Sequence, residues 1–266
     1  MIVEVKMKLK IYIHTDLEGI SGIDRAEIVK NDHPERNYCN ERLMADLNAA
    51  IDGAFAGGAT QVTVLDSHAG GGNFILPLLD KRADLDTREN KKWWGKLDES
   101  YCGTFFIGAH AMAGTINAFL DHTQSSKTWY NYWLNGRKMG ELAQWAIVAA
   151  NFNVPMLMVS GDEAACAEAR EFFSPLETAA VKKGVGRARA ILVDPDKATE
   201  MIREAAFKAM ALVGKARPFK PILPMEIKLE LKCTEYTDGL DQKPGVERLD
   251  GRTVRKLSYN YLDLFI

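Results

Sequence analysis

The sequence lacks any run of apolar residues that approaches the roughly 20 needed to span a membrane. It also lacks an excess of basic residues, because 34 Lys and Arg stand against 36 Asp and Glu, for a net charge of -2. Neither a membrane nor a nucleic acid is therefore an expected partner. With 47% hydrophobic and 26% charged residues over 266 positions, the chain has the composition of a globular protein with a well-buried core.

Closely spaced cysteines are missing as well. The four cysteines, Cys39, Cys102, Cys166 and Cys233, form no C-x-x-C pair, so neither a thiolate zinc site nor a disulfide framework is expected. Residues 1–8 contain too short an apolar stretch, and too many charges, for a signal peptide. We therefore expect free thiols and a cytoplasmic protein.

Strand and helix patterns alternate along the first part of the chain. A β-branched and aromatic run over 8–13, a helical pattern over 37–57 and a short apolar run over 61–65 form one strand–helix–strand unit. Such a unit pairs its two strands in parallel through a right-handed crossover. Further buried strands are expected at 101–107 and 154–160. The sequence therefore predicts an α/β fold with a mostly parallel sheet flanked by helices.

Carboxylates and histidines follow several of the expected strands. Asp16 and Glu18 follow the first strand, His68 the second and His110 the third, while Glu141 opens a helix. The carboxyl ends of parallel strands lie at one edge of a sheet, where ligands bind. Carboxylates and imidazoles together are ligands typical of zinc or manganese. Five such groups exceed what one tetrahedral ion uses, so we expect two metal ions that share a bridging carboxylate and activate water.

Each of these residues also has a simpler structural interpretation. Asp16 could cap a turn beside a solvated Glu18, Glu141 could complement the dipole of the helix it opens, and each histidine could be packed or exposed. Asp162 and Glu163 follow another strand and could form an outer layer around the ligands. The histidines lie directly after strand ends that should meet at one edge, and this favours the metal site over coincidence.

Two further histidines lie near the expected site. His122 follows an irregular loop and is preceded by Asp121, so it could act as an acid, a base or an oxyanion stabiliser, or be a surface residue. His14 could hydrogen-bond a ligating carboxylate or simply be packed.

The last third of the chain differs in pattern. A helical pattern over 196–213 and a proline-rich linker precede residues 225–233, which alternate as in a half-exposed antiparallel strand. The short aromatic segment 258–265 is expected to form a last helix. We therefore expect an α/β metal-binding catalytic domain over residues 1–173 and a smaller α+β C-terminal domain over residues 174–266.

Five motifs, taken in order, resemble a known family. They are residues 16–22 (DLEGISG), 65–68 (LDSH), 108–115 (GAHAMAGT), 121–123 (DHT) and 135–142 (NGRKMGEL). Together they resemble the D-aminopeptidase family of dipeptide-transport operons, whose members are zinc metallopeptidases. The likeness spans most of residues 9–170 and weakens in the C-terminal third.

The resemblance implies a dinuclear zinc site in which Asp16 bridges the ions. Four further ligands would complete the coordination: Glu18, His68, His110 and Glu141. His122 would be the catalytic histidine that stabilises the tetrahedral intermediate. Family members hydrolyse short peptides with an N-terminal D-residue such as D-alanine, and they assemble into ring-shaped homo-oligomers. On this resemblance we expect a zinc-dependent aminopeptidase that acts on small peptides.

Two alternatives remain. His14 and Thr15 precede Asp16 where small or aliphatic residues are usual in the family, and the C-terminal third diverges. The chain could therefore be a metal-dependent hydrolase of another small amide or ester. It could also be a non-catalytic scaffold that its metals stabilise. A closed coordination shell would favour the scaffold, whereas an exchangeable position would favour an enzyme.

Overall fold

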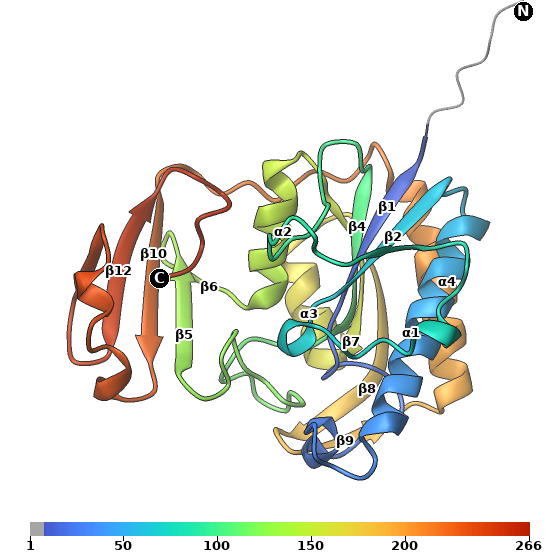
Figure 1. The fold of residues 1–266 in the computed structure, drawn as a ribbon, viewed down its shortest axis with the longest axis horizontal. Coiled ribbons are helices and arrows are strands. Elements are labelled where there is room, and N and C mark those ends of the chain that lie inside the picture. Colours follow the sequence, from blue (N-terminus) through green and yellow to red (C-terminus); the bar gives the residue numbers. More distant parts are fainter. Residues whose placement is uncertain (1–7) are drawn as a thin grey trace, which may run out of the picture.

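The computed structural model describes residues 8–266. Residues 1–7, which carry most of the argument against a signal peptide, lie outside this range. The described strands form a seven-stranded sheet and a five-stranded sheet, with helix α2 (Glu141–Asn151) between them (Figure 1). No helix within the described range has the length and apolarity to cross a membrane.

The large sheet confirms the expected α/β architecture. Its strand order is β3-β2-β1-β4-β7-β8-β9, in which every neighbouring pair is parallel except β8 and β9. The bounds of these strands are β1 Lys10–Thr15, β2 Gln61–Asp66, β3 Asp84–Asp86, β4 Gly103–Ala109, β7 Met156–Asp162, β8 Glu177–Gly186 and β9 Arg189–Leu192. The central strands are apolar and buried on both faces, as expected for parallel strands under helices.

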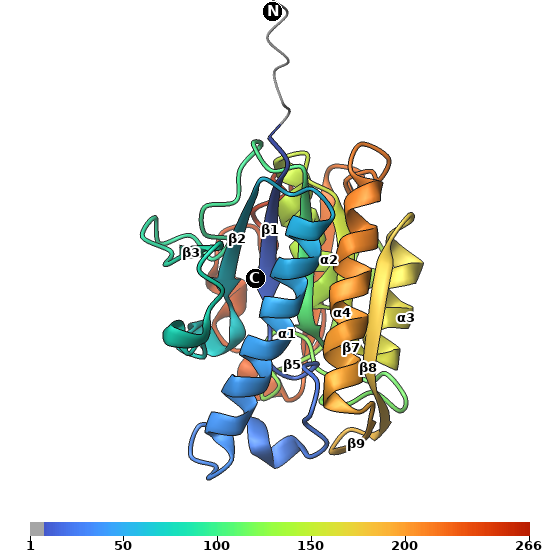
Figure 2. The same cartoon turned by 90° about the vertical axis from the view of Figure 1, so that its right-hand side faces the viewer.

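Helices cover both faces of this sheet. The long helices α1 (Arg36–Ala56) and α4 (Pro195–Ala209) lie side by side on one face (Figure 2), where Leu47 and Ile202 pack on strand residues such as Ile13. Helices α2 and α3 (Glu163–Phe172) contribute to the hydrophobic core of the other face. Polar residues such as Asp16, His68 and His110 follow the carboxyl ends of the parallel strands β1, β2 and β4.

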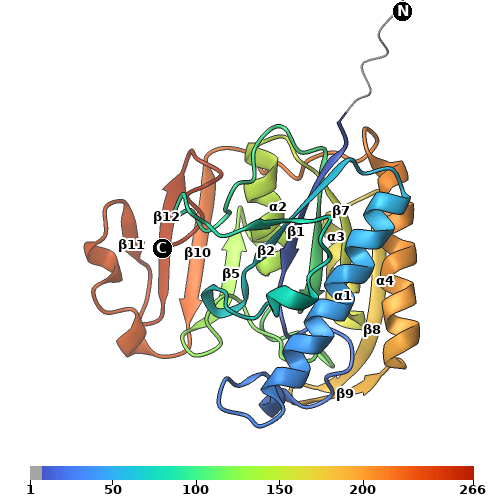
Figure 3. The ribbon, with the colours of Figure 1, turned by 45° about the vertical axis from the view of Figure 1, so that its right-hand side comes forward.

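The small sheet is antiparallel and packs on the far side of α2 (Figure 3). Its strands are β5 Trp129–Leu134, β6 Arg137–Lys138, β10 Met225–Leu231, β11 Val246–Arg248 and β12 Thr253–Ser258. Alternate residues of β10 are buried, which confirms the half-exposed pattern of the sequence. Tyr132 and Ile227 of this sheet share a core with Trp145 of α2, so the two sheets are joined through that helix.

The two sheets do not follow the expected domain boundary at 173/174. Residues 177–192 extend the large sheet, because β8 pairs in parallel with β7. Conversely, residues 129–138 belong to the small sheet, where β5 pairs with β10. The segment expected as a last helix is irregular after β12 ends at Ser258. Its aromatic residues serve packing instead, since the ring of Phe265 lies 5.1 Å from that of Trp93.

Candidate metal centre

The loop after β1 runs along the end of β4. The Asp16 N–H donates to the carbonyl of Ile107 at 2.8 Å, and the Gly19 N–H donates to that of Gly108 at 2.8 Å. A Cβ atom at Gly19 would lie 2.0 Å from the Ala109 carbonyl oxygen, and one at Gly108 would lie 2.2 Å from that of Asp16. Only glycine permits this approach. It brings the residues after β1 and β4 together.

One group of side chains gathers around His68. Its Nδ1 lies 2.9 Å from Oδ1 of Asp16 and 3.0 Å from Oε2 of Glu18. All three are at most partly exposed, and Asp16 and Glu18 are buried. One ring nitrogen thus faces two carboxylates, a geometry that needs a proton or a metal ion between them.

A second group gathers around Glu141, the first residue of α2. Its Oε1 lies 3.3 Å from Nε2 of His110 and 3.6 Å from Nε2 of His122. The same His110 nitrogen is 3.3 Å from Oδ2 of Asp16. The two oxygens of Asp16 therefore face different groups, Oδ1 toward His68 and Oδ2 toward His110. The structure brings together all six residues singled out from the sequence, in two adjoining groups.

The hydrogen bonds of His110 define which nitrogen is available. Its Nδ1 lies 3.1 Å from the carbonyl oxygen of Ala111, so Nδ1 carries the proton and donates it. Nε2 is buried and makes no hydrogen bond with any described residue. In the neutral ring, the lone pair of Nε2 points at carboxylate oxygens of Asp16 and Glu141, which is unfavourable unless a proton or a metal ion lies among them. A divalent ion fits this set of donors, as an ordering bond on the distal nitrogen is typical of metal-binding histidines.

The charges of these groups depend strongly on one another. Burial by itself would raise the pKa of Asp16, but contacts with His110 and His68 hold it well below its usual range. Burial opposes charge on the histidines too, yet Glu18 and Asp16 raise the pKa of His68 to about 10. Glu141 and Asp16 likewise raise the pKa of His110 well above its ordinary value. The buried carboxylates thus favour positive charge at these histidines, and metal ions at the same place would supply that charge instead.

The loop that carries Glu18 is anchored by Lys182 of β8. The Lys182 side chain is 1% exposed, and its Nζ donates to the carbonyls of Glu18 at 2.8 Å and Ile23 at 3.0 Å. The Nζ atom also lies 4.5 Å from the centre of the Phe119 ring. Burial lowers the pKa of Lys182 to about 8, despite the nearby carboxylates of Asp162 and Asp46. The local sequence pattern around Lys182 does not indicate this role, because it does not show that β8 pairs with β7.

We predict that Lys182→Met lowers the free energy of unfolding by about 1–3 kcal/mol, because two backbone carbonyls lose a charged donor. The bound metal should also be held less tightly, since the Glu18 backbone is no longer fixed. Urea unfolding and metal titration measure both effects. Lys183→Met is the matched control, because Lys183 is exposed and, among the residues that the structure describes, its Nζ pairs only with Glu163, at 3.4 Å. Equal losses in the two variants would contradict this role.

The loop that carries His68 is held by Asp66, the last residue of β2. The Asp66 carboxylate accepts hydrogen bonds from the backbone N–H groups of Asn73 at 2.6 Å and Phe74 at 3.2 Å. The side-chain amide of Asn73 donates to Asp66 and, at 2.9 Å, to the carbonyl of His68. The glycines at 70–72 therefore belong to a loop that is tied back to the end of β2.

His122 lies against the second group. Its ring stacks on that of His110 with centroids 3.9 Å apart, and its Nδ1–H donates to the carbonyl of Leu120 at 2.8 Å. The remaining nitrogen, Nε2, faces Glu141 and the cleft. This position suits either a catalytic group or a ligand.

The other residues considered from the sequence lie outside the two groups. Burial lowers the pKa of His14 to about 4; its ring stacks on Trp145, and its Nδ1 lies 3.1 Å from Oγ of Ser67. Asp162 caps α3 and accepts a hydrogen bond from the Phe119 N–H at 2.8 Å. Glu163 is exposed and pairs with Lys183. The structure gives neither acidic residue a contact with the ligand candidates.

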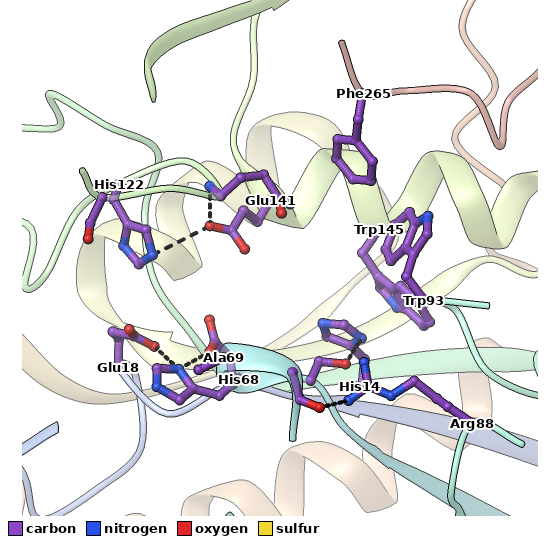
Figure 4. A pocket seen from close by; sticks show the side chains of 15 residues that line it. His14, Glu18, His68, Ala69, Arg88, Trp93, His122, Glu141, Trp145 and Phe265 are labelled. Atoms are coloured by element: carbon purple, nitrogen blue, oxygen red, sulfur yellow. Dashed lines mark hydrogen bonds and ion pairs between the residues drawn. The ribbon is translucent and has the colours of Figure 1, made fainter. Parts of the chain in front are cut away.

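Both groups open into one cleft of about 430 Å³ (Figure 4). His122 and Glu141 lie on one side, and Glu18 and His68 lie opposite them. The aromatic side chains of Trp93, Trp145 and Phe265 also line it, as do Ser67 and Arg88. A buried cluster of ligand-type side chains beside an open cleft is suited to a reaction on a small bound molecule.

Comparisons with known proteins identify relatives of almost the whole chain. A D-aminopeptidase from Bacillus subtilis (strain 168) is 32% identical over 249 residues, which are 92% of this chain and 89% of that protein. The solved structure of the Zn-dependent D-aminopeptidase DppA from Bacillus subtilis, a self-compartmentalizing protease, matches with a TM-score of 0.90. That match is 29% identical and covers 96% of this chain and 94% of the other.

The family model described as D-aminopeptidase, peptidase M55, matches residues 9–266. This range includes all the motifs that suggested the resemblance and extends it through the C-terminal third. The chain belongs to the D-aminopeptidase family.

Proposed function

We propose that the protein is a zinc-dependent aminopeptidase that hydrolyses short peptides, those with an N-terminal D-residue such as D-alanine in particular. The observation that carries this proposal is the convergence of six metal-ligand-type side chains at one end of an open cleft, around a buried His110 nitrogen that no described residue satisfies. The family, and the zinc dependence of the Bacillus subtilis relative, support it over another amide or ester hydrolase and over a scaffold.

Five side chains would hold two zinc ions. Asp16 would bridge them, since its two oxygens face His68 on one side and His110 on the other. The remaining ligands would be Glu18 and His68 for one ion, and His110 and Glu141 for the other. When bound, such a pair of ions lowers the pKa of a water molecule and polarises the carbonyl group of a substrate.

The protein's own groups then position the substrate and stabilise charge. The carboxylates of Glu18 and Glu141 face each other across the cleft and offer acceptors for a substrate's free amino group (Figure 4). His122 is placed to act on the scissile carbonyl. Because its Nδ1–H is committed to Leu120, only a proton on Nε2 can be donated to the developing oxyanion.

A substrate panel with metal control tests the proposed function. We expect hydrolysis of D-Ala-D-Ala to exceed that of L-Ala-L-Ala, and both to exceed a small ester and a simple amide without a free amine. A chelator should abolish turnover, and added zinc should restore it. Preference for the ester or the simple amide would favour the alternative hydrolase. A chelator that unfolds the protein, with no turnover on any substrate beforehand, would favour the scaffold.

We further propose a ring-shaped homo-oligomer. The support comes from the Bacillus subtilis relative, which is described as a self-compartmentalizing protease. Light scattering coupled to gel filtration should give a mass that is a multiple of the 29.6 kDa chain. The cytoplasmic location expected from the sequence stays a prediction.

A further inference from the structure

The cleft extends beyond the two ligand groups to a guanidinium. Arg88 is the only Arg or Lys among the described residues that line it. The other formally charged side chains of the lining are Asp16, Glu18 and Glu141 at the metal end. In the close view, Arg88 lies across the cleft from His122 and Glu141, near His14 (Figure 4). The cleft is therefore polarised, with its acidic groups and its one guanidinium in different places.

The backbone and one guanidinium nitrogen hold Arg88 in this position. Nη2 donates to the carbonyls of Asp66 at 2.7 Å and Gly70 at 2.6 Å, both in the segment that carries His68. The backbone N–H of Arg88 donates to Oδ1 of Asp86 at 2.8 Å. The backbone has a φ of 54°, in the left-handed region that residues other than glycine rarely adopt. Arg88 is thus fixed relative to the metal-ligand loop.

Part of the guanidinium remains available to a ligand. An arginine side chain has five N–H donors, and the two on Nη2 are used by the carbonyls. No described residue accepts from Nε or Nη1, and no described carboxylate pairs with Arg88. Three donors and a full positive charge are left at the cleft, beside the aromatic rings of Trp93, Trp145 and Phe265.

We propose that Arg88 binds the C-terminal carboxylate of the peptide substrate, so that the enzyme prefers short peptides with a free carboxyl end. This inference rests on the proposed function, which sets the free amine and the scissile bond at the metal end. A zwitterionic dipeptide then has its amine near Glu18 and Glu141 and its carboxylate at Arg88. Guanidinium–carboxylate hydrogen bonds are short and strong, and the rings of Trp93, Trp145 and Phe265 add an apolar wall to the same cleft.

Arg88 is therefore a residue that determines specificity, not a metal ligand. A carboxylate binder discriminates against a peptide amide, because the amide offers no negative charge to the guanidinium. A residue with a purely structural role, holding the loop of Asp66 and Gly70, would not make this distinction. The ratio of kcat/KM for the peptide acid to kcat/KM for the peptide amide therefore distinguishes carboxylate binding from a purely structural role.

The kinetic experiment compares D-Ala-D-Ala with its C-terminal amide. For the wild-type enzyme we expect kcat/KM to be about 10- to 100-fold higher for the acid, the usual worth of a hydrogen bond to a charged group. In Arg88→Met the acid should lose this advantage, so that the ratio falls to about 1, while the amide changes little. Arg88→Lys should retain part of the preference. The loss for the acid in Arg88→Met is expected mainly as a higher KM.

Lys92→Met is the matched control, because it removes one positive charge from the same segment at an exposed residue that does not line the cleft. It should leave the acid-to-amide ratio unchanged. Equal loss for acid and amide in Arg88→Met would overturn the proposal, and so would a wild-type enzyme that hydrolyses both alike.

A binding experiment separates this proposal from the proposed function. Calorimetry with the zinc-loaded protein measures a D-Ala-D-Ala isostere in which CH₂–NH replaces the peptide bond, as free acid and as amide. If the wild type binds the acid more tightly than the amide and Arg88→Met does not, carboxylate binding by Arg88 is supported. This holds even if no peptide is hydrolysed, in which case only the aminopeptidase assignment fails. If the wild type binds the acid and the amide with equal affinity, carboxylate binding by Arg88 is overturned, whatever the catalytic result.

Discussion

Replacing Asp16 with alanine is expected to remove bound zinc and activity together. Both oxygens of this carboxylate face histidine nitrogens, 2.9 Å away in His68 and 3.3 Å away in His110. Loss of a bridging ligand should weaken both ions, and loss of a ligand or its supporting partners commonly costs 10- to 100-fold or more in metal affinity. Metal analysis after gel filtration, with peptidase assays on the same samples, measures the two losses.

The fold should survive this change, because the backbone of Asp16 keeps its 2.8 Å hydrogen bond to Ile107. Asp16→Asn provides a second variant that keeps the shape and removes the charge. Asp24→Ala is the control, since Asp24 lies in the same loop, pairs with Arg25 and does not line the cleft. Full zinc occupancy in both Asp16 variants would refute the bridging role.

Replacing His122 with alanine is expected to have a different effect, in which zinc stays bound and kcat falls by about 10²- to 10³-fold. The reason is its position at the edge of the second group, with one nitrogen committed to Leu120 and the other facing the cleft. KM should change much less than kcat, because the interaction is made in the transition state. Zinc content and steady-state kinetics are measured on the same preparation.

His33→Ala controls for the loss of a histidine, because His33 lies outside the cleft. His122 could instead be a zinc ligand, because its Nε2 lies 3.6 Å from Oε1 of Glu141. If His122→Ala loses one equivalent of zinc along with activity, His122 belongs to the coordination shell and its catalytic assignment is wrong.

The strand ends were predictable from sequence because they depend on local signals. Asp16, His68 and His110 each follow an apolar run bounded by polar residues or glycine, and the parallel arrangement brings such ends to one edge. Strand ends indicated Asp16, Glu18, His68 and His110, whereas Glu141 was indicated by a helix start and His122 by its position after an irregular loop. These signals could not give their order in space, which is set by the close approach of Gly19 and Gly108.

Contacts between distant segments were not predictable in the same way. The pairing of β5 with β10 joins residues roughly 100 positions apart, so nothing local in either strand indicates that residues 129–138 belong to the small sheet. Lys182 and Arg88 look like ordinary surface charges in sequence. Their roles depend on the carbonyls of Glu18, Asp66 and Gly70, which only the folded chain brings to them.

The most direct test of the two-zinc site is anomalous diffraction at the zinc edge from crystals grown with zinc. Two peaks are expected, one contacted by Asp16, Glu18 and His68, the other by Asp16, His110 and Glu141. No peak at this edge of the sheet, or a single peak that Asp16 does not contact, would contradict the site on which the proposed function rests.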